Sequence, residues 1–110
     1  LNAKGKNGIK SGATTDEEGT ASLTIRNVNL TINAPVNDAI NAEQTLNIES
    51  GTLTISAGDD AIHSDYTLNV GAFGTTGPAI KITSCYEGLE AATLNILSGN
   101  ISITASRMTA

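Results

Sequence analysis

The feature that most constrains the fold is a short phrase that returns four times along the chain. Each copy has one or two polar residues, a small residue and then a branched aliphatic residue. The copies are Lys6–Ser11, Asn37–Ala42, Asp59–Ser64 and Tyr86–Ala91. Self-similarity at a period of roughly 22 residues is typical of solenoids. Such a repeat places equivalent residues above one another, one coil apart.

Each phrase is followed by two segments in which aliphatic residues alternate with Thr, Asn or Ser, as in Leu46–Ile48 and Leu53–Ile55. A spacing of two predicts strands and excludes amphipathic helices. Alternation alone leaves antiparallel hairpins open, but the constant phase of the repeat favours parallel stacking. We therefore predict an all-β fold, a right-handed single-stranded parallel β-helix of about four coils of roughly 22 residues.

One continuous aliphatic core follows from this prediction, because the alternating residues of every coil point to the same interior. The residues expected in it are Ile9, Leu23, Ile25, Leu30, Ile32, Ile40, Leu46, Ile48, Leu53, Ile55, Ile62, Leu68, Val70, Ile80, Ile82, Leu89, Leu94, Ile96, Ile101 and Ile103.

The copies differ in length because of two insertions, Gly12–Thr20 and Gly71–Pro78. Insertions in solenoids form surface loops, often on the binding face, although tolerated drift explains them equally well. Residues 1–110 are interpreted as a single β-helix segment of a longer chain, since Arg107–Ala110 begins a fifth phrase. The alternative is end-to-end self-association, which would cover the open coils.

Charge and composition exclude several classes of function. The net charge is −5, with six basic and eleven acidic residues, which argues against nucleic acid because phosphate neutralisation dominates that binding. No apolar run approaches the roughly 18 residues of a membrane span, so no membrane insertion is expected. The single cysteine, Cys85, can form no internal disulfide. No catalytic triad, phosphate-binding loop or paired-cysteine motif is present.

An acidic ladder is the main chemical feature, because Asp38, Asp60 and Glu87 occupy one position on successive coils. Like charges about 5 Å apart repel by roughly a kcal/mol in water. The ladder is either a solvated acidic edge or a cation site, and Ca²⁺ takes about six to eight such oxygen ligands. The candidate metal ligands are Asp38, Asp59, Asp60 and Glu87, with Glu43, Asp65 and Glu90 as further candidates.

Three segments, Gly58–Asp65, Thr83–Ala91 and Ile101–Ser106, resemble the bacterial β-helix carbohydrate-binding domains of clostridial and related secreted proteins. The resemblance extends from about Lys6 to Ser106. That family is similar in fold to calcium-dependent pectate lyases and is associated with calcium and plant polysaccharides. The resemblance implies a Ca²⁺ cofactor at the ladder and an extracellular or cell-surface bacterial location. Arg107-Met108 stands in place of another acidic pair, so no such site is expected beyond the fourth coil.

We therefore expect a calcium-dependent carbohydrate-binding module for acidic, polygalacturonate-like or β-linked, cellulose-like plant polysaccharides. Aromatic residues make up 3% of the chain, too few for a stacking platform, so ions and hydrogen bonds should carry the binding. The sugar-contacting candidates are Tyr86, His63 and Lys81.

Two alternatives stay open. A pectate-lyase-like enzyme would need a base near the metal, from Lys81 or Lys10. The spacing puts Lys81 on a different face from the ladder. A structural β-helix stalk of a surface adhesin is the other alternative, and the paired aspartates count weakly against it.

Overall fold

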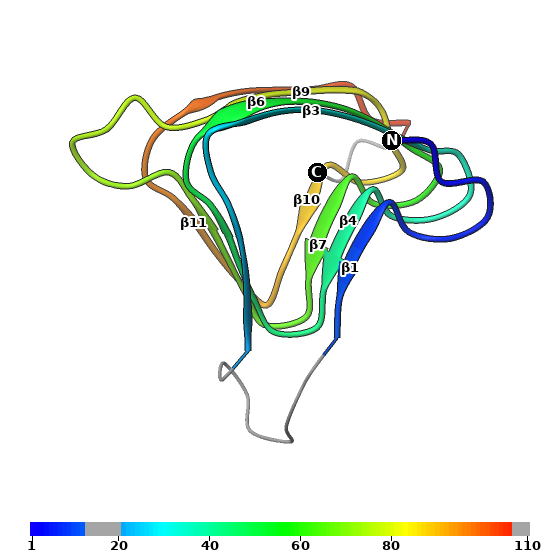
Figure 1. The fold of residues 1–110 in the computed structure, drawn as a ribbon, viewed down its shortest axis with the longest axis horizontal. Helices are drawn as coiled ribbons and strands as arrows, with labels where there is room; N and C mark the ends of the chain where they lie inside the picture. Colours follow the sequence, from blue (N-terminus) through cyan, green and yellow to red (C-terminus); the bar gives the residue numbers. More distant parts are fainter. Residues whose placement is uncertain (13–20, 107–110) are drawn as a thin grey trace.

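The computed structural model describes residues 1–12 and 21–106, and these form a parallel β-helix with a triangular cross-section (Figure 1). The all-β solenoid prediction is confirmed. The first sheet contains β1 (Ile9–Ser11), β4 (Ile40–Ala42), β7 (Ile62–Ser64) and β10 (Leu89–Glu90). The second sheet contains β2 (Ser22–Ile25), β5 (Thr45–Ile48), β8 (Thr67–Val70) and β11 (Thr93–Ile96). The third sheet contains β3 (Val28–Ala34), β6 (Gly51–Ala57), β9 (Ala79–Ser84) and β12 (Asn100–Ile103).

Every strand pairs in parallel with its equivalent in the neighbouring coil, as the repeat predicts. The aliphatic residues of the four phrases, Ile9, Ile40, Ile62 and Leu89, are in register. The sequence suggested two strands after each phrase, and the phrase itself supplies the third. Stacked residues of the second sheet are 23, 22 and 26 residues apart along the chain. The longer spacing reflects the insertion between β8 and β9.

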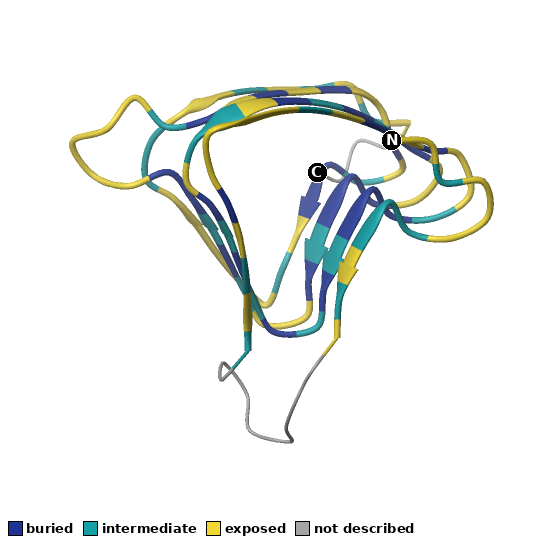
Figure 2. Cartoon of the chain, viewed as in Figure 1, coloured by how far each residue is buried: buried dark blue, intermediate teal, exposed yellow. Residues whose placement is uncertain are grey.

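The core is aliphatic and is best closed in the two middle coils, where the inward residues of β5, β6, β7 and β8 are buried (Figure 2). The predicted core residues share one register from coil to coil, but the core is open at the fourth coil. Leu94 and Ile96 are 42% and 52% exposed. Both keep the inward register, opposite Leu68 and Val70, but among the described residues no coil lies beyond β11 to cover them. Ile9, Leu23, Leu30, Ile101 and Ile103 are only half-buried.

The corner between the second and third sheets requires left-handed backbone, with positive φ at Asn27, Gly51 and Gly99. Asn and Gly are the residues that adopt this conformation most readily. The insertion Gly71–Pro78 leaves the stack at this same corner and forms the loop that projects between β8 and β9 (Figure 1). The other predicted insertion lies, apart from Gly12, outside the described residues, as does the fifth phrase at Arg107.

Candidate functional site

The acidic ladder lies at the start of the first sheet, on the turn that leads into each strand. Asp38, Asp60 and Glu87 each stand two residues before the aliphatic residue of their phrase, and those aliphatic residues are in register. The predicted stacking of the three carboxylates is therefore confirmed. Asp38 and Asp60 are buried, at 4% and 5% exposure. Burial of two acidic side chains one coil apart demands hydrogen bonds, a cation or protonation of the carboxyl group.

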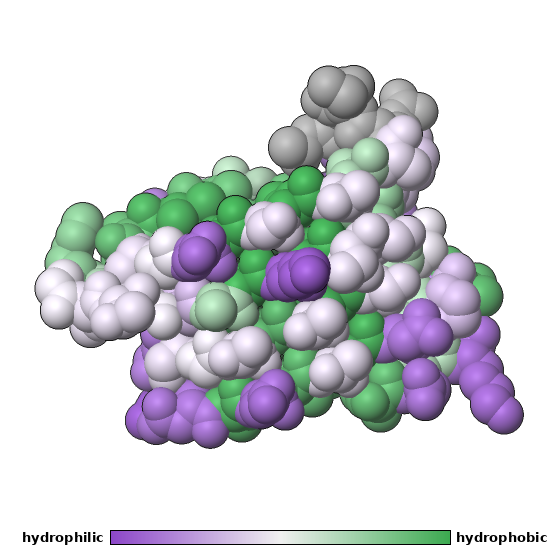
Figure 3. Space-filling model, turned by 90° about the horizontal axis from the view of Figure 1, so that it is seen from above, coloured by the Kyte–Doolittle hydropathy of each residue, from purple (hydrophilic) through white to green (hydrophobic). Residues whose placement is uncertain are grey.

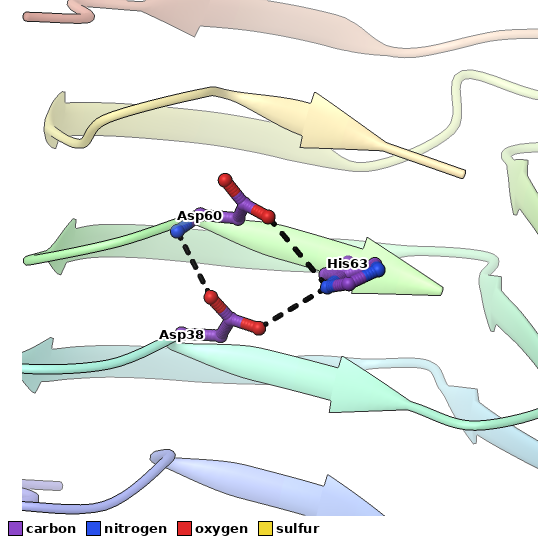
Figure 4. A group of neighbouring side chains, drawn as sticks. All are labelled: Asp38, Asp60 and His63. Atoms are coloured by element: carbon purple, nitrogen blue, oxygen red, sulfur yellow. Dashed lines mark hydrogen bonds and ion pairs between the residues drawn. The ribbon is translucent and has the colours of Figure 1, made fainter. Parts of the chain in front are cut away.

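Asp38 is satisfied by its neighbours. Its Oδ1 accepts a hydrogen bond from the backbone N–H of Asp60 at 2.9 Å (Figure 4). Its Oδ2 accepts one from Asn41 Nδ2 at 2.7 Å. In the coil before, Asn7 Oδ1 accepts the backbone N–H of Asp38 at 3.1 Å. Side-chain oxygens thus cap the next coil's backbone at two successive steps of the ladder.

Asp60 breaks this pattern. Its Oδ1 is buried and has no hydrogen-bond partner, so it does not cap the Glu87 backbone as Asp38 caps Asp60. Burial raises the pKa of Asp60 to about 8, with the neighbouring acids Glu90, Asp38 and Asp59 adding to the shift. An unpartnered buried oxygen beside three further carboxylates is the most unusual electrostatic feature of the described residues.

His63 lies at the centre of the carboxylates on the outer face of β7. Its Nδ1 is 3.3 Å from Asp38 Oδ2 and 3.6 Å from Asp60 Oδ2 (Figure 4). Its Nε2 is 3.1 Å from Asp65 Oδ1 and 3.9 Å from Glu90 Oε1. The sequence pointed to His63 as a sugar contact, but in the structure its nearest neighbours are acidic side chains.

Among residues 1–12 and 21–106, two groups of side chains bring ligand atoms close enough for one metal ion. One is Asp38, Asp60 and His63, and the other is Asp60, Glu87 and Glu90; within each, the ligand atoms lie within 4.8 Å of one another. The second group offers carboxylate oxygens alone, which are the ligands that Ca²⁺ prefers. The first includes an imidazole, which suits transition metals better. The oxygen set, with its orphaned Asp60 Oδ1, therefore fits a calcium ion.

The other predicted ligands lie at varying distances from this cluster. Glu43 Oε1 lies 3.7 Å from Lys10 Nζ, on the far side of β4 from the ladder. Asp59 is exposed, one residue before Asp60, and its carbonyl accepts the backbone N–H of Tyr86. Asp65 follows β7 and reaches the cluster through His63.

The three sugar-contacting candidates are not brought together. Tyr86 and His63 lie in consecutive coils at the first sheet, whereas Lys81 is on β9 in the third sheet, in register with Thr54 and Ser102. Figure 3 shows that sheet from outside, with weakly polar residues among apolar ones and a few strongly hydrophilic side chains. A shallow groove of about 290 Å³ runs there beside Lys81. Lys81 and the ladder therefore lie on different sheets, as the spacing in the sequence predicted.

One contribution to the cluster was missed at the level of sequence: Asn41, which holds Asp38. Glu90, one of the further metal-ligand candidates, stands in register with His63 on the outer face of the first sheet. The signal for Asn41 was available, because Asn41, His63 and Glu90 all follow the aliphatic residue of their phrase directly. Cys85 adds no chemistry: it is buried, and burial raises the pKa of its thiol, which keeps it protonated and unreactive.

The comparisons with known proteins concern the whole chain. A family model described as "Carbohydrate-binding domain-containing protein" matches residues 1–110. No curated protein and no solved structure matches significantly. Within the described part of the chain, no helix has the length and apolar character needed to cross a membrane. On the strength of the match over its full length, the chain belongs to the family of carbohydrate-binding domain-containing proteins.

Proposed function

We propose that this chain binds acidic polysaccharide through a calcium ion held by Asp60, Glu87 and Glu90. Membership of the carbohydrate-binding family supports a saccharide partner. The finer proposal is carried by the Asp60 carboxyl group, whose buried Oδ1 has no hydrogen-bond partner and which offers an oxygen within 4.8 Å of oxygens of Glu87 and Glu90. A cation there would satisfy that oxygen and offset the repulsion within the group.

Charge explains why a cation would matter for the ligand. The chain carries a net charge of −5, so a polyuronate approaching the ladder would be repelled. A calcium ion keeps coordination positions for ligands other than the protein, because three carboxylates that each offer one oxygen supply fewer than its usual six to eight. Uronate oxygens could fill these positions.

Within this proposal the protein's own residues have separate roles. Asp60, Glu87 and Glu90 hold the ion, and Asp38 fixes the backbone of Asp60 through the hydrogen bond to its N–H. His63 stands between the acidic side chains of two coils and limits their approach to one another. Tyr86 precedes Glu87 and is 39% exposed, which places an aromatic side chain beside the proposed ligand site.

Two further expectations belong to the proposal. An extracellular or cell-surface location would give access to plant polysaccharide and to calcium at high concentration. End-to-end association of two chains would cover Leu94 and Ile96, which are exposed on β11. Both remain predictions.

The test is affinity electrophoresis in gels containing polygalacturonate, with calcium or with chelator. We expect retardation in calcium, loss of retardation in chelator, and loss in both conditions for Asp60→Asn. Glu49→Gln removes the same charge at a distant corner and serves as the control, which should migrate as the parent chain does. Retardation that is unaffected by chelator and by Asp60→Asn would disprove the calcium proposal.

The enzyme alternative needs its own assay. Release of unsaturated uronide from polygalacturonate, followed in the ultraviolet, would identify a lyase. Lys81 lies on the third sheet, away from the cluster, and Lys10 lies 3.7 Å from Glu43. Steady product formation that Lys81→Ala or Lys10→Ala abolishes would replace the binding proposal with a catalytic one.

A further inference from the structure

A second recess lies at the corner between the second and third sheets, where the loop 71–77 leaves the stack. The loop and three coils line a groove of about 450 Å³, a size typical of small-ligand sites. Its lining includes Asn47 and Asn69 from the outer face of the second sheet, and Arg26, Glu49 and Thr75 from the corner. The acidic cluster lies on the first sheet, so the two sites occupy different sheets.

The floor of this corner groove is a row of carboxamides. Asn69 Nδ2 donates to Asn47 Oδ1 at 2.9 Å, and Asn95 Nδ2 donates to Asn69 Oδ1 at 2.9 Å. Each carboxamide nitrogen carries two N–H groups. One is used in the row, and within the described residues the other makes no hydrogen bond. Asn47 and Asn69, the two members of the row that line the groove, therefore each keep one N–H group available for a ligand, in carboxamides held by their neighbours.

The charges at the groove balance. Arg26 and Glu49 are the charged residues of its described lining, and Arg26 Nε lies 3.3 Å from Glu49 Oε1. The lining thus carries no net charge, in contrast to the acidic cluster. A ligand that matches amide and hydroxyl groups without net charge is itself polar and neutral.

The loop that forms the wall of the groove is tied down. Ser98 Oγ accepts the backbone N–H of Ala72 at 3.0 Å and lies 3.0 Å from Thr75 Oγ1. Gly71 has a φ of 73°, and a side chain at this position would collide with Ser98. The wall is therefore preformed, which lowers the entropic cost of binding.

Phe73 stands on this same loop and is 82% exposed, the most exposed large hydrophobic residue described. Its neighbours Ala72 and Thr75 line the groove. Phe73 is not itself part of the groove lining, but its exposed ring is free to contact a ligand that extends beyond the groove onto the loop. An aromatic ring offers a flat apolar face, which matches the C–H face of a pyranose ring. The polar groove and the aromatic ring of Phe73 would both suit a sugar, which carries hydroxyl groups and has an apolar ring face.

We propose that the corner groove binds a neutral oligosaccharide, with its hydroxyl groups hydrogen-bonded to Asn47 and Asn69 and one sugar ring stacked on Phe73. The inference rests on the carbohydrate-binding part of the proposed function and is independent of its calcium ion. It gives the chain two saccharide sites of different chemistry, one for charged and one for neutral polymers.

The experiment is a titration of the ¹⁵N-labelled chain with cellohexaose and with xylohexaose, in chelator. At least one should shift the backbone amide signals of residues 69–77 and of Asn47. Phe73→Ala should weaken that binding about fivefold to tenfold, the effect of losing an aromatic contact. Adding Asn69→Ala to Phe73→Ala should weaken binding of the sugar further. Val36→Ala, which truncates another exposed apolar residue at a distant turn, should leave affinity unchanged.

Three outcomes would overturn the inference: no shift with either sugar, shifts confined to the third-sheet groove beside Lys81, or unchanged affinity in Phe73→Ala. Because Phe73 is exposed, its truncation should not disturb the fold, and the amide spectrum checks this directly. Asp60→Asn separates the two proposals. Asp60→Asn should not change binding of cellohexaose or xylohexaose. This expectation holds whatever the variant does to retention by polygalacturonate, so either proposal can fail without the other.

Discussion

Two successive steps of the same ladder differ in one hydrogen bond. In the step from Asp38 to Asp60, the first carboxylate accepts the backbone N–H of the second residue. In the step from Asp60 to Glu87, the corresponding oxygen of Asp60 has no partner. The two aspartates are almost equally buried, at 4% and 5% exposure. Burial alone therefore does not distinguish a structural carboxylate from one available to a ligand. The distinction lies in whether the next coil supplies a donor.

The largest effect is expected in the pH dependence of stability without metal. The pKa of Asp60 is raised from 3.8 to about 8 in the folded chain, so between these values the folded state holds a proton that the unfolded state has released. The Asp60 contribution to stability should therefore fall as pH rises from about 4 to about 8.

Asp60→Asn should remove this slope, and urea unfolding of both chains in chelator at pH 5, 7 and 9 measures it. Calcium affinity of the parent chain should rise over the same range, because protons compete with the ion for Asp60. Parallel stability profiles for the two chains would show that Asp60 is not protonated in the folded state.

The next largest effect is expected in the core beneath the ladder. Ile62 lies two residues after Asp60 and is fully buried, so Ile62→Ala should cost about 2–5 kcal/mol of unfolding free energy. Ile96→Ala, at a site 52% exposed, is the control and should cost clearly less. Equal losses in chemical denaturation would mean that the open end of the stack is covered in solution.

A smaller loss is expected from Asp38→Ala. The substitution leaves the buried backbone N–H of Asp60 without its acceptor, which typically costs about 1–3 kcal/mol. Measured in chelator above pH 8, Asp60→Ala should behave in the opposite way, because it removes a charged group that has no partner on one oxygen. If Asp38→Ala and Asp60→Ala lowered the free energy of unfolding equally, the two carboxyl groups would have the same role in stability, contrary to this prediction.

The smallest effect is expected for an acidic side chain at the surface. Glu49 pairs with Arg26 at the corner, where both side chains are largely exposed, at 45% and 64%. Glu49→Gln should change stability by less than about 1 kcal/mol, as is usual for exposed ion pairs. A larger loss would show that the corner depends on this pair, and thermal melting in low and high salt would confirm it.

Register was predictable from sequence because it depends on spacing alone. The aliphatic residue of each phrase must enter the core, so the acidic residue two positions before it must stack on its equivalent. The side-chain hydrogen bonds of the ladder were not predictable, since spacing fixes which residues stack but not which carboxylate oxygen meets the N–H of the next coil. The exposure of Leu94 and Ile96 could not be read from alternation, which gives the direction of a side chain but not the presence of a covering coil. The corner groove needed the fold as well, because Asn47, Asn69 and the loop meet only when the coils stack.

The carboxamide row has a direction. Asn95 donates to Asn69, Asn69 donates to Asn47, and Asn47 Nδ2 lies 3.4 Å from Thr24 Oγ1. Every bond points the same way along the axis of the helix, so the surface is not the same when approached from its two ends. A polymer lying along it meets donors and acceptors in an order that reverses when the polymer is turned round. Such a surface can tell the reducing end of a sugar chain from the non-reducing end without contacting either one.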